Sequence, residues 1–297
     1  MRVLVTGGSG FIGRHVVRRL QEKGDEVVVA DLVDFPDGSV KFVTGDLREA
    51  AVVERAVTSD LDAVVHLAAL TSVLQSVNAP HDTFRTNVQA TELLLERCRT
   101  EGVRRFVFAS TNAVVGNVGA DMIDEHVPLM PLTPYGATKA ASEMLLSAYS
   151  AAYGLITVAL RFTNIYGAGM QTKDSVIARL MRAAQSGGGI QIYGNGEQLR
   201  DYLYVTDAAR AIELGLTLVA SDTVTIGAAE SVSMNVLHQL ACEATGVAIG
   251  AEHIDGKPGE MPAVIVRTSH AAELGFSCEY DVLAGLKATW ADFRVRA

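Results

Sequence analysis

The chain of 297 residues is poor in cysteine, and its three cysteines are far apart. Cys98, Cys242 and Cys278 form no CxxC arrangement, so the sequence indicates neither a disulfide scaffold nor a thiolate metal site. We expect reduced thiols in a cytoplasmic protein, with no bound metal. Charges interrupt each apolar segment before it reaches the length of a membrane span. A membrane is therefore not an expected partner.

Clusters of basic residues are missing as well. The chain has 34 acidic and 25 basic residues, for a formal net charge of −9. A broad surface for nucleic acid is therefore not expected, although local donors can still bind phosphate groups. The apolar content of 49% and the charged content of 20% are typical of a packed globular protein.

The first half of the sequence contains an alternation of strand-like and helical segments. Its strands are continuous apolar runs, the pattern of parallel strands that are covered on both faces. This alternation predicts an α/β fold with a doubly wound parallel sheet of the Rossmann type. We expect strands at 2–6, 26–31, 40–46, 61–69, 105–111 and 156–162, and helices at 12–23, 49–58, 81–101 and 135–153.

Three glycines, Gly7, Gly10 and Gly13, lie between the first strand and the first helix. Such a loop turns sharply, lets the backbone approach a pyrophosphate and directs helix N–H groups at its charge. Asp31 ends the second strand, where its carboxylate would accept hydrogen bonds from the adenosine ribose and repel a 2′-phosphate. No arginine follows at 32–33 to reverse that preference. The spacing therefore predicts NAD rather than NADP.

Two later strand ends allow either a ligand contact or a purely structural role. Asp46 ends the third strand, where it would cap the following helix or contact the adenine amino group. Leu67, Ala68 and Ala69 end the fourth strand with mostly small residues. These suit the close passage of a ligand, and they suit sheet packing equally well.

After about residue 165 the alternation becomes less regular. We expect a smaller C-terminal α/β lobe that binds the substrate, separated from the first domain by a cleft. The dinucleotide-binding domain would span 1–165 and be rejoined by parts of 195–230, with the interleaved substrate lobe over 166–297. Within 166–297 we expect helices at 175–185, 206–219 and 233–245, and strands at 190–193 and 223–226.

Tyr135 and Lys139 have the i, i+4 spacing that places two side chains on one face of a helix. The lysine ammonium and the positive charge of a nicotinamide would lower the pKa of the phenol, which could then exchange a proton with a sugar hydroxyl. The alternative is a half-buried tyrosine beside a solvated lysine. Ser110 and Thr111 end the fifth strand at the carboxyl edge, where such sheets bind ligands.

Five motifs in the order of one known family cover essentially the whole chain. Together they resemble the extended short-chain dehydrogenase/reductase family, and within it the NAD-dependent branch of nucleotide-sugar epimerases and dehydratases. The motifs are TGGSGFIG (6–13), HLAA (66–69), PYGATK (134–139), RFTNIYG (161–167) and RDYLYVTDAARA (200–211).

The resemblance implies a role for each catalytic residue. Tyr135 would be the acid/base, Lys139 would tune it and hold the nicotinamide ribose, and Thr111 rather than Ser110 would aid proton transfer. The expected cofactor contacts are Gly7, Gly10, Phe11, Ile12, Gly13, Asp31, Asp46, Leu47, Leu67, Ala68, Ala69, Asn87, Tyr135 and Lys139.

The resemblance also implies a substrate site for a nucleotide sugar, with a UDP-sugar favoured. Arg200 would form paired, charge-assisted bonds to its phosphates. A local surface ion pair between Arg200 and Asp201 is the alternative. The segment 257–260 resembles an RxGE motif with lysine in place of arginine. The expected substrate contacts are Thr71, Asn164, Ile192, Tyr193, Arg200, Lys257 and Glu260.

The residues after Thr111 bear on the reaction. Relatives that dehydrate or decarboxylate the sugar carry a carboxylate there, whereas this chain has Asn112 and Ala113. We therefore expect a 4-epimerase of the UDP-glucose/UDP-galactose type, which oxidises the C4 hydroxyl and returns the hydride after the keto-sugar rotates. A dehydrogenase, ketoreductase or dehydratase of the family, or a non-catalytic relative, stays open. Val115 replaces the tyrosine that is usual in the family, so the identity of the sugar stays open as well.

Two helical segments, 87–98 and 140–149, have wide apolar faces. In the family such helices pair to form a homodimer, which we expect here, while ordinary core packing is the alternative. The residues concerned are Leu93, Leu94, Leu95, Met144, Leu145 and Leu146.

Overall fold

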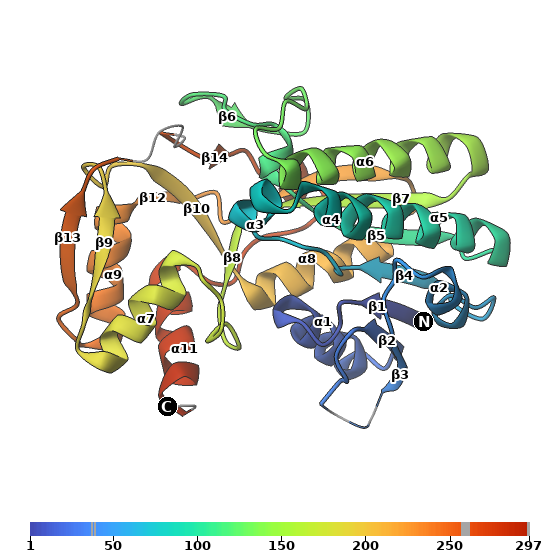
Figure 1. Cartoon of the computed structure of the whole chain (residues 1–297), viewed down its shortest axis with the longest axis horizontal. Coiled ribbons are helices and arrows are strands. Elements are labelled where there is room, and N and C mark those ends of the chain that lie inside the picture. Colours follow the sequence, from blue (N-terminus) through green and yellow to red (C-terminus); the bar gives the residue numbers. More distant parts are fainter. Residues whose placement is uncertain (37, 39, 257–261, 296–297) are drawn as a thin grey trace. The chain divides into compact units, whose positions relative to one another are not determined.

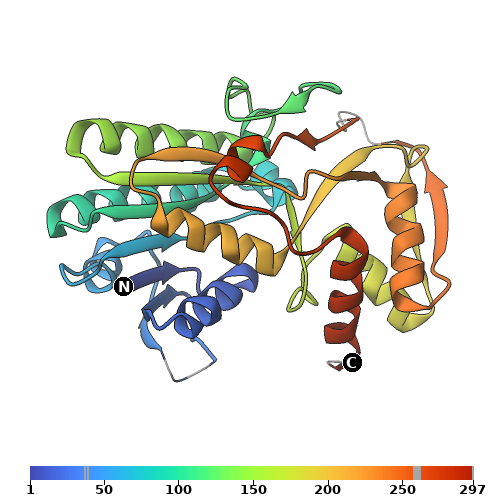
Figure 2. The ribbon, with the colours of Figure 1, turned by 180° about the vertical axis from the view of Figure 1, so that it is seen from behind.

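The computed structural model describes the whole chain except residues 37, 39, 257–261 and 296–297. The chain forms two compact units, whose elements are shown from opposite sides in Figures 1 and 2. The cofactor-binding and substrate-binding roles expected for the two parts of the chain remain predictions. Unit 1 comprises Met1–Asn117, Glu125–Arg161 and Ala209–Val224, and unit 2 comprises Val118–Asp124, Phe162–Ala208 and Thr225–Ala297.

A seven-stranded parallel sheet confirms the predicted doubly wound α/β fold of the Rossmann type. Its strand order is β11-β7-β5-β4-β1-β2-β3, so the chain reverses direction across the sheet after β3. The central pairings β1–β2, β1–β4, β2–β3 and β4–β5 are parallel. The strands are β1 (Arg2–Thr6), β2 (Glu26–Asp31), β3 (Lys41–Thr44), β4 (Ala63–His66), β5 (Arg105–Thr111), β7 (Ile156–Phe162) and β11 (Asp222–Ile226).

Helices cover both faces of the sheet, as the alternation of side chains along β5 shows. Phe106 and Phe108 are completely buried in the core that packs against α2, α5 and α6. Val107 points the other way and contacts Gly215 of α8. Figures 1 and 2 show these two layers. The helices are α1 (Phe11–Glu22), α2 (Ala50–Ala56), α5 (Ala90–Glu101), α6 (Pro134–Tyr153) and α8 (Val205–Thr217).

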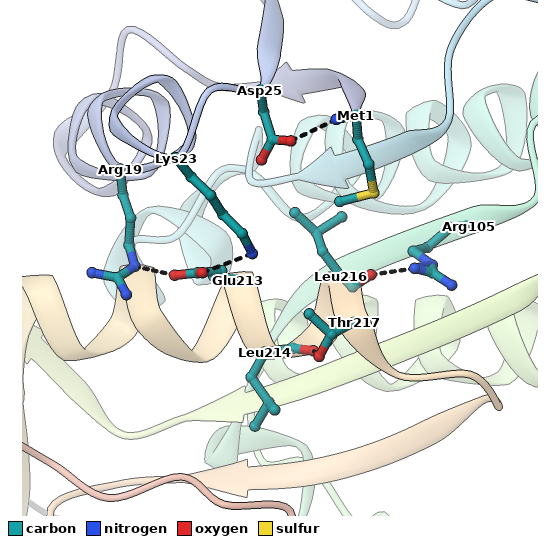
Figure 3. A network of polar contacts seen from close by, with 9 residues as sticks. All are labelled: Met1, Arg19, Lys23, Asp25, Arg105, Glu213, Leu214, Leu216 and Thr217. Carbon is teal, nitrogen blue, oxygen red and sulfur yellow. Dashed lines mark hydrogen bonds and ion pairs between the residues drawn. The ribbon is translucent and has the colours of Figure 1, made fainter.

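Polar contacts join the C-terminal half of α8 to the α1 region and to β5 (Figure 3). Glu213 of α8 pairs with Arg19, and the Lys23 ammonium lies 2.8 Å from the same carboxylate. The Arg105 guanidinium donates to the carbonyl of Leu216. These contacts, with the place of β11 in the large sheet, tie 209–224 to unit 1 although it is distant in sequence.

Unit 2 contains three small sheets. Of their strands, the sequence predicted only β9 (Gly189–Tyr193). One sheet has the order β12-β10-β8, and the others pair β13 with β9 and β14 with β6. The strands are β6 (Met122–Ile123), β8 (Asn164–Tyr166), β9 (Gly189–Tyr193), β10 (Leu199–Tyr204), β12 (Ser231–Ser233), β13 (Gly250–Ile254) and β14 (Ile265–Val266). The helices are α7 (Val176–Ser186), α9 (Met234–Thr245), α10 (Ser269–Glu273) and α11 (Val282–Val295).

The long helix expected at 81–101 is divided into three parts. It consists of α4 (Pro80–Phe84), a π-helical turn (Arg85–Gln89) and α5, and a short helix α3 (Val73–Asn78) precedes it. Among the described residues, no helix is both long and apolar enough to cross a bilayer.

The apolar faces expected to form a dimer are largely internal. Leu94, Leu95 and Leu146 are at most 2% exposed and belong to the core of unit 1. Leu93 and Leu145 pack against that core. Met144, in contrast, is 64% exposed. Core packing therefore accounts for most of this pattern, and the homodimer stays a prediction.

Candidate functional site

The glycine loop between β1 and α1 has no room for a side chain at Gly7 or Gly13. Gly7 has a φ of +69°, and a Cβ there would lie 2.7 Å from the backbone nitrogen of Ala68. A Cβ at Gly13 would clash with the backbone of Gly7 and Gly8. Gly10, at the N-cap of α1, has no side chain to bind the first N–H groups of the helix. The N–H groups of this turn, which includes Phe11 and Ile12, are thus suited to a pyrophosphate.

Asp31 lies at the end of β2 beside this loop. Its carboxylate accepts hydrogen bonds from the backbone N–H groups of Ser9, at 3.0 Å, and Val33, at 3.3 Å. A carboxylate has about four lone-pair positions, so acceptor capacity remains for two ribose hydroxyls. The side chain is half-buried rather than enclosed. The residues present therefore fit an adenosine ribose.

Asp46 does not cap a helix, so that alternative is wrong. The helix α2 begins at Ala50, and Glu49 is its N-cap residue. The Asp46 carboxylate instead accepts hydrogen bonds from the backbone N–H of Arg48 at 2.9 Å and from its guanidinium Nε at 2.8 Å. This guanidinium lowers the pKa of Asp46. The neighbouring Leu47 is buried, and contact of either residue with the cofactor stays a prediction.

The segment after β4 is held by the amide of Asn87. Its Oδ1 accepts from the backbone N–H of Leu70 at 2.8 Å, and its Nδ2 donates to the Leu70 carbonyl and to Thr138, both at 3.0 Å. Asn87 is 1% exposed, so the structure gives this predicted cofactor residue a positional role between the 67–70 segment and α6. Leu67, Ala68 and Ala69 are half-buried, whereas the predicted substrate residue Thr71 is exposed.

The proposed acid/base, Tyr135, lies in the first turn of α6. Thr133 caps this helix by accepting the N–H of Gly136 at 3.2 Å, and Gly136 itself fits closely under the carbonyl of Ala113. Thr111 hydrogen-bonds the Tyr135 hydroxyl and so favours its ionisation, but burial dominates and raises the pKa of Tyr135 to about 12. The lower pKa expected from the sequence depends on the positive charge of a bound nicotinamide, so it stays a prediction for the cofactor-bound protein.

Lys139 follows one turn later and is only 3% exposed, so the alternative of a solvated lysine is wrong. Its ammonium donates to the carbonyl of Ala109 at 2.7 Å and lies 4.4 Å from the centre of the Phe108 ring. Burial lowers the pKa of Lys139 to about 7, and the charge of Glu143 opposes this change. Burial and Glu143 therefore act in opposite directions on the charge of this side chain.

In unit 2, four predicted substrate residues line one cavity of about 820 Å³. Its size is within the range of small-molecule sites. The Asn164 amide donates to the carbonyl of Asp201 at 2.9 Å, and the Arg200 guanidinium donates to the carbonyl of Leu199 at 2.7 Å. The four residues are Asn164, Ile192, Tyr193 and Arg200.

The alternative of a surface ion pair between Arg200 and Asp201 is wrong, because Asp201 is completely buried. Its Oδ1 accepts hydrogen bonds from the hydroxyl of Thr163 at 2.7 Å and from the N–H of Ala228 at 2.9 Å. Burial raises the pKa of Asp201. The remaining predicted contacts, Lys257 and Glu260, lie outside the described residues.

Sequence reasoning missed a buried ion pair on α6 and β7, one turn beyond the predicted catalytic residue Lys139. Glu143 of α6 and Arg161 of β7 lie 2.7 Å apart, with both side chains 6% exposed. The one available signal was the spacing of Glu143, four residues after Lys139. Within the described part of the chain, no group of three His, Cys, Asp or Glu residues could hold a metal ion, and the three cysteines are free.

Comparison with known proteins gives consistent similarities over the full length of the chain. Residues 3–227 match the NAD dependent epimerase/dehydratase family. A UDP-glucose 4-epimerase of Azospirillum brasilense is 32% identical over 96% of this chain and 89% of its own length. A dTDP-glucose 4,6-dehydratase of Streptomyces niveus is also 32% identical, over 97% of this chain and 91% of that protein. The crystal structure of the Thermus thermophilus UDP-glucose 4-epimerase in complex with NAD matches all of both chains at 34% identity, with a TM-score of 0.94.

Proposed function

Because the chain belongs to the NAD dependent epimerase/dehydratase family, as its motifs indicated, we propose that it is a nucleotide-sugar 4-epimerase. The proposed substrates are UDP-glucose and UDP-galactose. One observation carries the proposal. Thr111 hydrogen-bonds the Tyr135 hydroxyl and the buried Lys139 follows one turn later on α6, while Asn112 and Ala113, the two residues after Thr111, offer no carboxylate for removing water.

The proposed chemistry assigns one task to each of three side chains. Tyr135 takes the proton of the sugar C4 hydroxyl, and Thr111 hydrogen-bonds the phenol oxygen and favours its ionised form. The ammonium of Lys139 would stabilise the developing tyrosinate and hold the nicotinamide ribose. NAD, when bound, supplies a reversible hydride acceptor. The loop of Gly7, Gly10 and Gly13, with Asp31, would hold it.

The cavity of unit 2 supports a nucleotide-binding role for its residues. Arg200 would bind the substrate phosphates, Asn164 would contact the pyrophosphate, and the pair Ile192–Tyr193 would lie against the base. Thr71, Lys257 and Glu260 complete the proposed substrate contacts. A homodimer in the cytoplasm belongs to the same proposal.

The test is to incubate the purified protein with UDP-galactose and no added cofactor. We expect UDP-glucose to form without a net absorbance change in the NADH band, because the hydride returns to the sugar. Strict dependence on added NAD(P)H would instead identify a dehydrogenase or ketoreductase. A product from UDP-glucose that has lost the mass of water would identify a dehydratase. Native mass spectrometry would check that NAD is retained, and a protein that binds NAD without turnover would be a non-catalytic relative.

A further inference from the structure

Glu143 lies on the face of α6 that carries the proposed catalytic residues. It follows Tyr135 by eight residues and Lys139 by four, so the three side chains lie one above another along the helix. Its carboxylate accepts a hydrogen bond of 2.5 Å from Ser110, the residue before Thr111 on β5. One buried carboxylate therefore contacts the strand end that bears Thr111 and stands one turn from the lysine.

Arg161 of β7 holds the same carboxylate from the other side. Its Nη2 lies 2.7 Å from Glu143 Oε2, and its Nε lies within 3.2 Å of both oxygens. A further nitrogen donates to the carbonyl of Glu125 at 3.3 Å. A buried ion pair is weak evidence of a stabilising role, because removing two charges from water costs about as much as their attraction returns. The burial of Glu143 and Arg161 therefore needs an explanation other than stability.

The charged and titratable groups around Lys139 come from three elements. Tyr135 and Glu143 lie on α6, Arg161 on β7 behind Glu143, and His66 on β4. The pKa of His66 is lowered to about 3 by burial, so this ring is neutral at physiological pH. The β5 strand contributes the carbonyl of Ala109. Glu143 is the group whose negative charge favours the ammonium form of Lys139, against its burial.

We propose that Glu143 and Arg161 are positioning residues that set the charge of Lys139, with Glu143 holding the lysine in its ammonium form and Arg161 limiting that effect. The hydrogen bond from Ser110 fixes the strand end beside Tyr135 in the same arrangement. This inference rests on the proposed function for its catalytic meaning, but the charge of Lys139 can be measured without turnover.

The test uses lysine labelled with carbon-13 at Cε, since the chain has only six lysines. The Lys139 resonance is the one missing from Lys139→Met, and its pH titration is followed by NMR in the full-length protein. The wild-type midpoint is expected near 7. Glu143→Gln should lower it by about one pH unit or more, and Arg161→Met should raise it by about one unit.

Opposite shifts distinguish this role from a structural one, because both single variants leave a buried charge unpaired and lose stability alike. If a single variant does not fold, Glu143→Gln combined with Arg161→Met removes both charges and should still lower the midpoint, since Glu143 is the charge that acts on the pKa of Lys139. Glu143→Asp keeps the negative charge, so its Lys139 midpoint should be closer to that of the wild type than to that of Glu143→Gln. Equal midpoints in the wild type and the double variant would overturn the inference, as would shifts of one sign in both single variants. Shifts as expected in a protein that does not epimerise UDP-galactose would overturn the proposed function alone.

Discussion

The two units hold their candidate functional groups in different ways. In unit 1, Thr111, Lys139 and Glu143 are at most 9% exposed, and each makes a polar contact with another buried or half-buried group. In unit 2, Asn164 is exposed and Arg200 is half-buried, and both donate to backbone carbonyls. One set of groups is desolvated, and the other faces an open cavity.

This difference has an energetic consequence. Electrostatic interactions are stronger where water is excluded, so a single substitution in unit 1 should change the chemical step. Groups that line a solvated cavity exchange water for ligand, so their loss should weaken binding by a smaller factor. We therefore expect substitutions in unit 1 to act on kcat and those in unit 2 to act on KM.

The largest effect should come from Tyr135→Phe, which removes the proposed acid/base. We expect kcat for UDP-galactose to fall about 100-fold to 10,000-fold, with NAD content unchanged. Tyr149→Phe is the matched control, since Tyr149 lies on the same helix and its hydroxyl contacts Glu96 at 3.3 Å. Initial rates and the NAD released on denaturation measure both properties. Full activity of Tyr135→Phe would show that Tyr135 is not the acid/base and would contradict the catalytic role given to unit 1.

Lys139→Met should lower kcat by about 100-fold while it stabilises the fold by about 1–3 kcal/mol at pH 7. The pKa of Lys139 is lowered by burial from 10.5 to about 7 in the folded chain. Below pH 7 both states carry the proton, so the cost of burying the ammonium is fully present. Between pH 7 and 10.5 the unfolded chain binds a proton that the folded chain has lost, so the wild type gains stability as pH rises.

Denaturant unfolding of the wild type and Lys139→Met across this pH range measures the effect. The stability advantage of the variant should shrink between pH 7 and 10.5. Lys173→Met serves as the control because Lys173 is exposed. A stability advantage that does not change with pH would mean that folding does not lower the pKa of Lys139.

The contrast between the units also explains what the sequence could predict. Periodicity located every strand of the large sheet, and the i, i+4 spacing placed Tyr135 and Lys139 together. It could not give the burial that raises the pKa of Tyr135, because that burial depends on segments distant in sequence. The pair of Glu143 and Arg161 was missed for a related reason: it links a helix to a strand through contacts that no local pattern marks. In unit 2, β8 and β12 have only three residues each, too few for a period to appear.

In unit 2, Arg200→Met should raise KM for UDP-galactose about tenfold to 100-fold with a small change in kcat. Arg200→Lys should recover only part of this loss, since lysine cannot form the paired bonds of a guanidinium to phosphate. Arg179→Gln is the control, because Arg179 lines the same cavity but pairs with Asp174 at 2.6 Å. A loss confined to kcat in Arg200→Met would contradict the division between the units.

The smallest effect tests whether burial, rather than membership of a unit, decides the outcome. Asp31 belongs to unit 1, but its side chain is half-buried and accepts hydrogen bonds from backbone N–H groups. In this it resembles Asn164 and Arg200 of unit 2, which also bond to the backbone. Asp31→Asn removes the charge that would repel a 2′-phosphate, so the preference for NAD over NADP should fall by about tenfold with kcat nearly unchanged. Competition between the two cofactors for the cofactor-free protein measures this ratio, with Asp34→Asn as the control for an exposed carboxylate nearby. A large loss of kcat in Asp31→Asn would show that position in unit 1, and not desolvation, makes a residue critical for the chemistry.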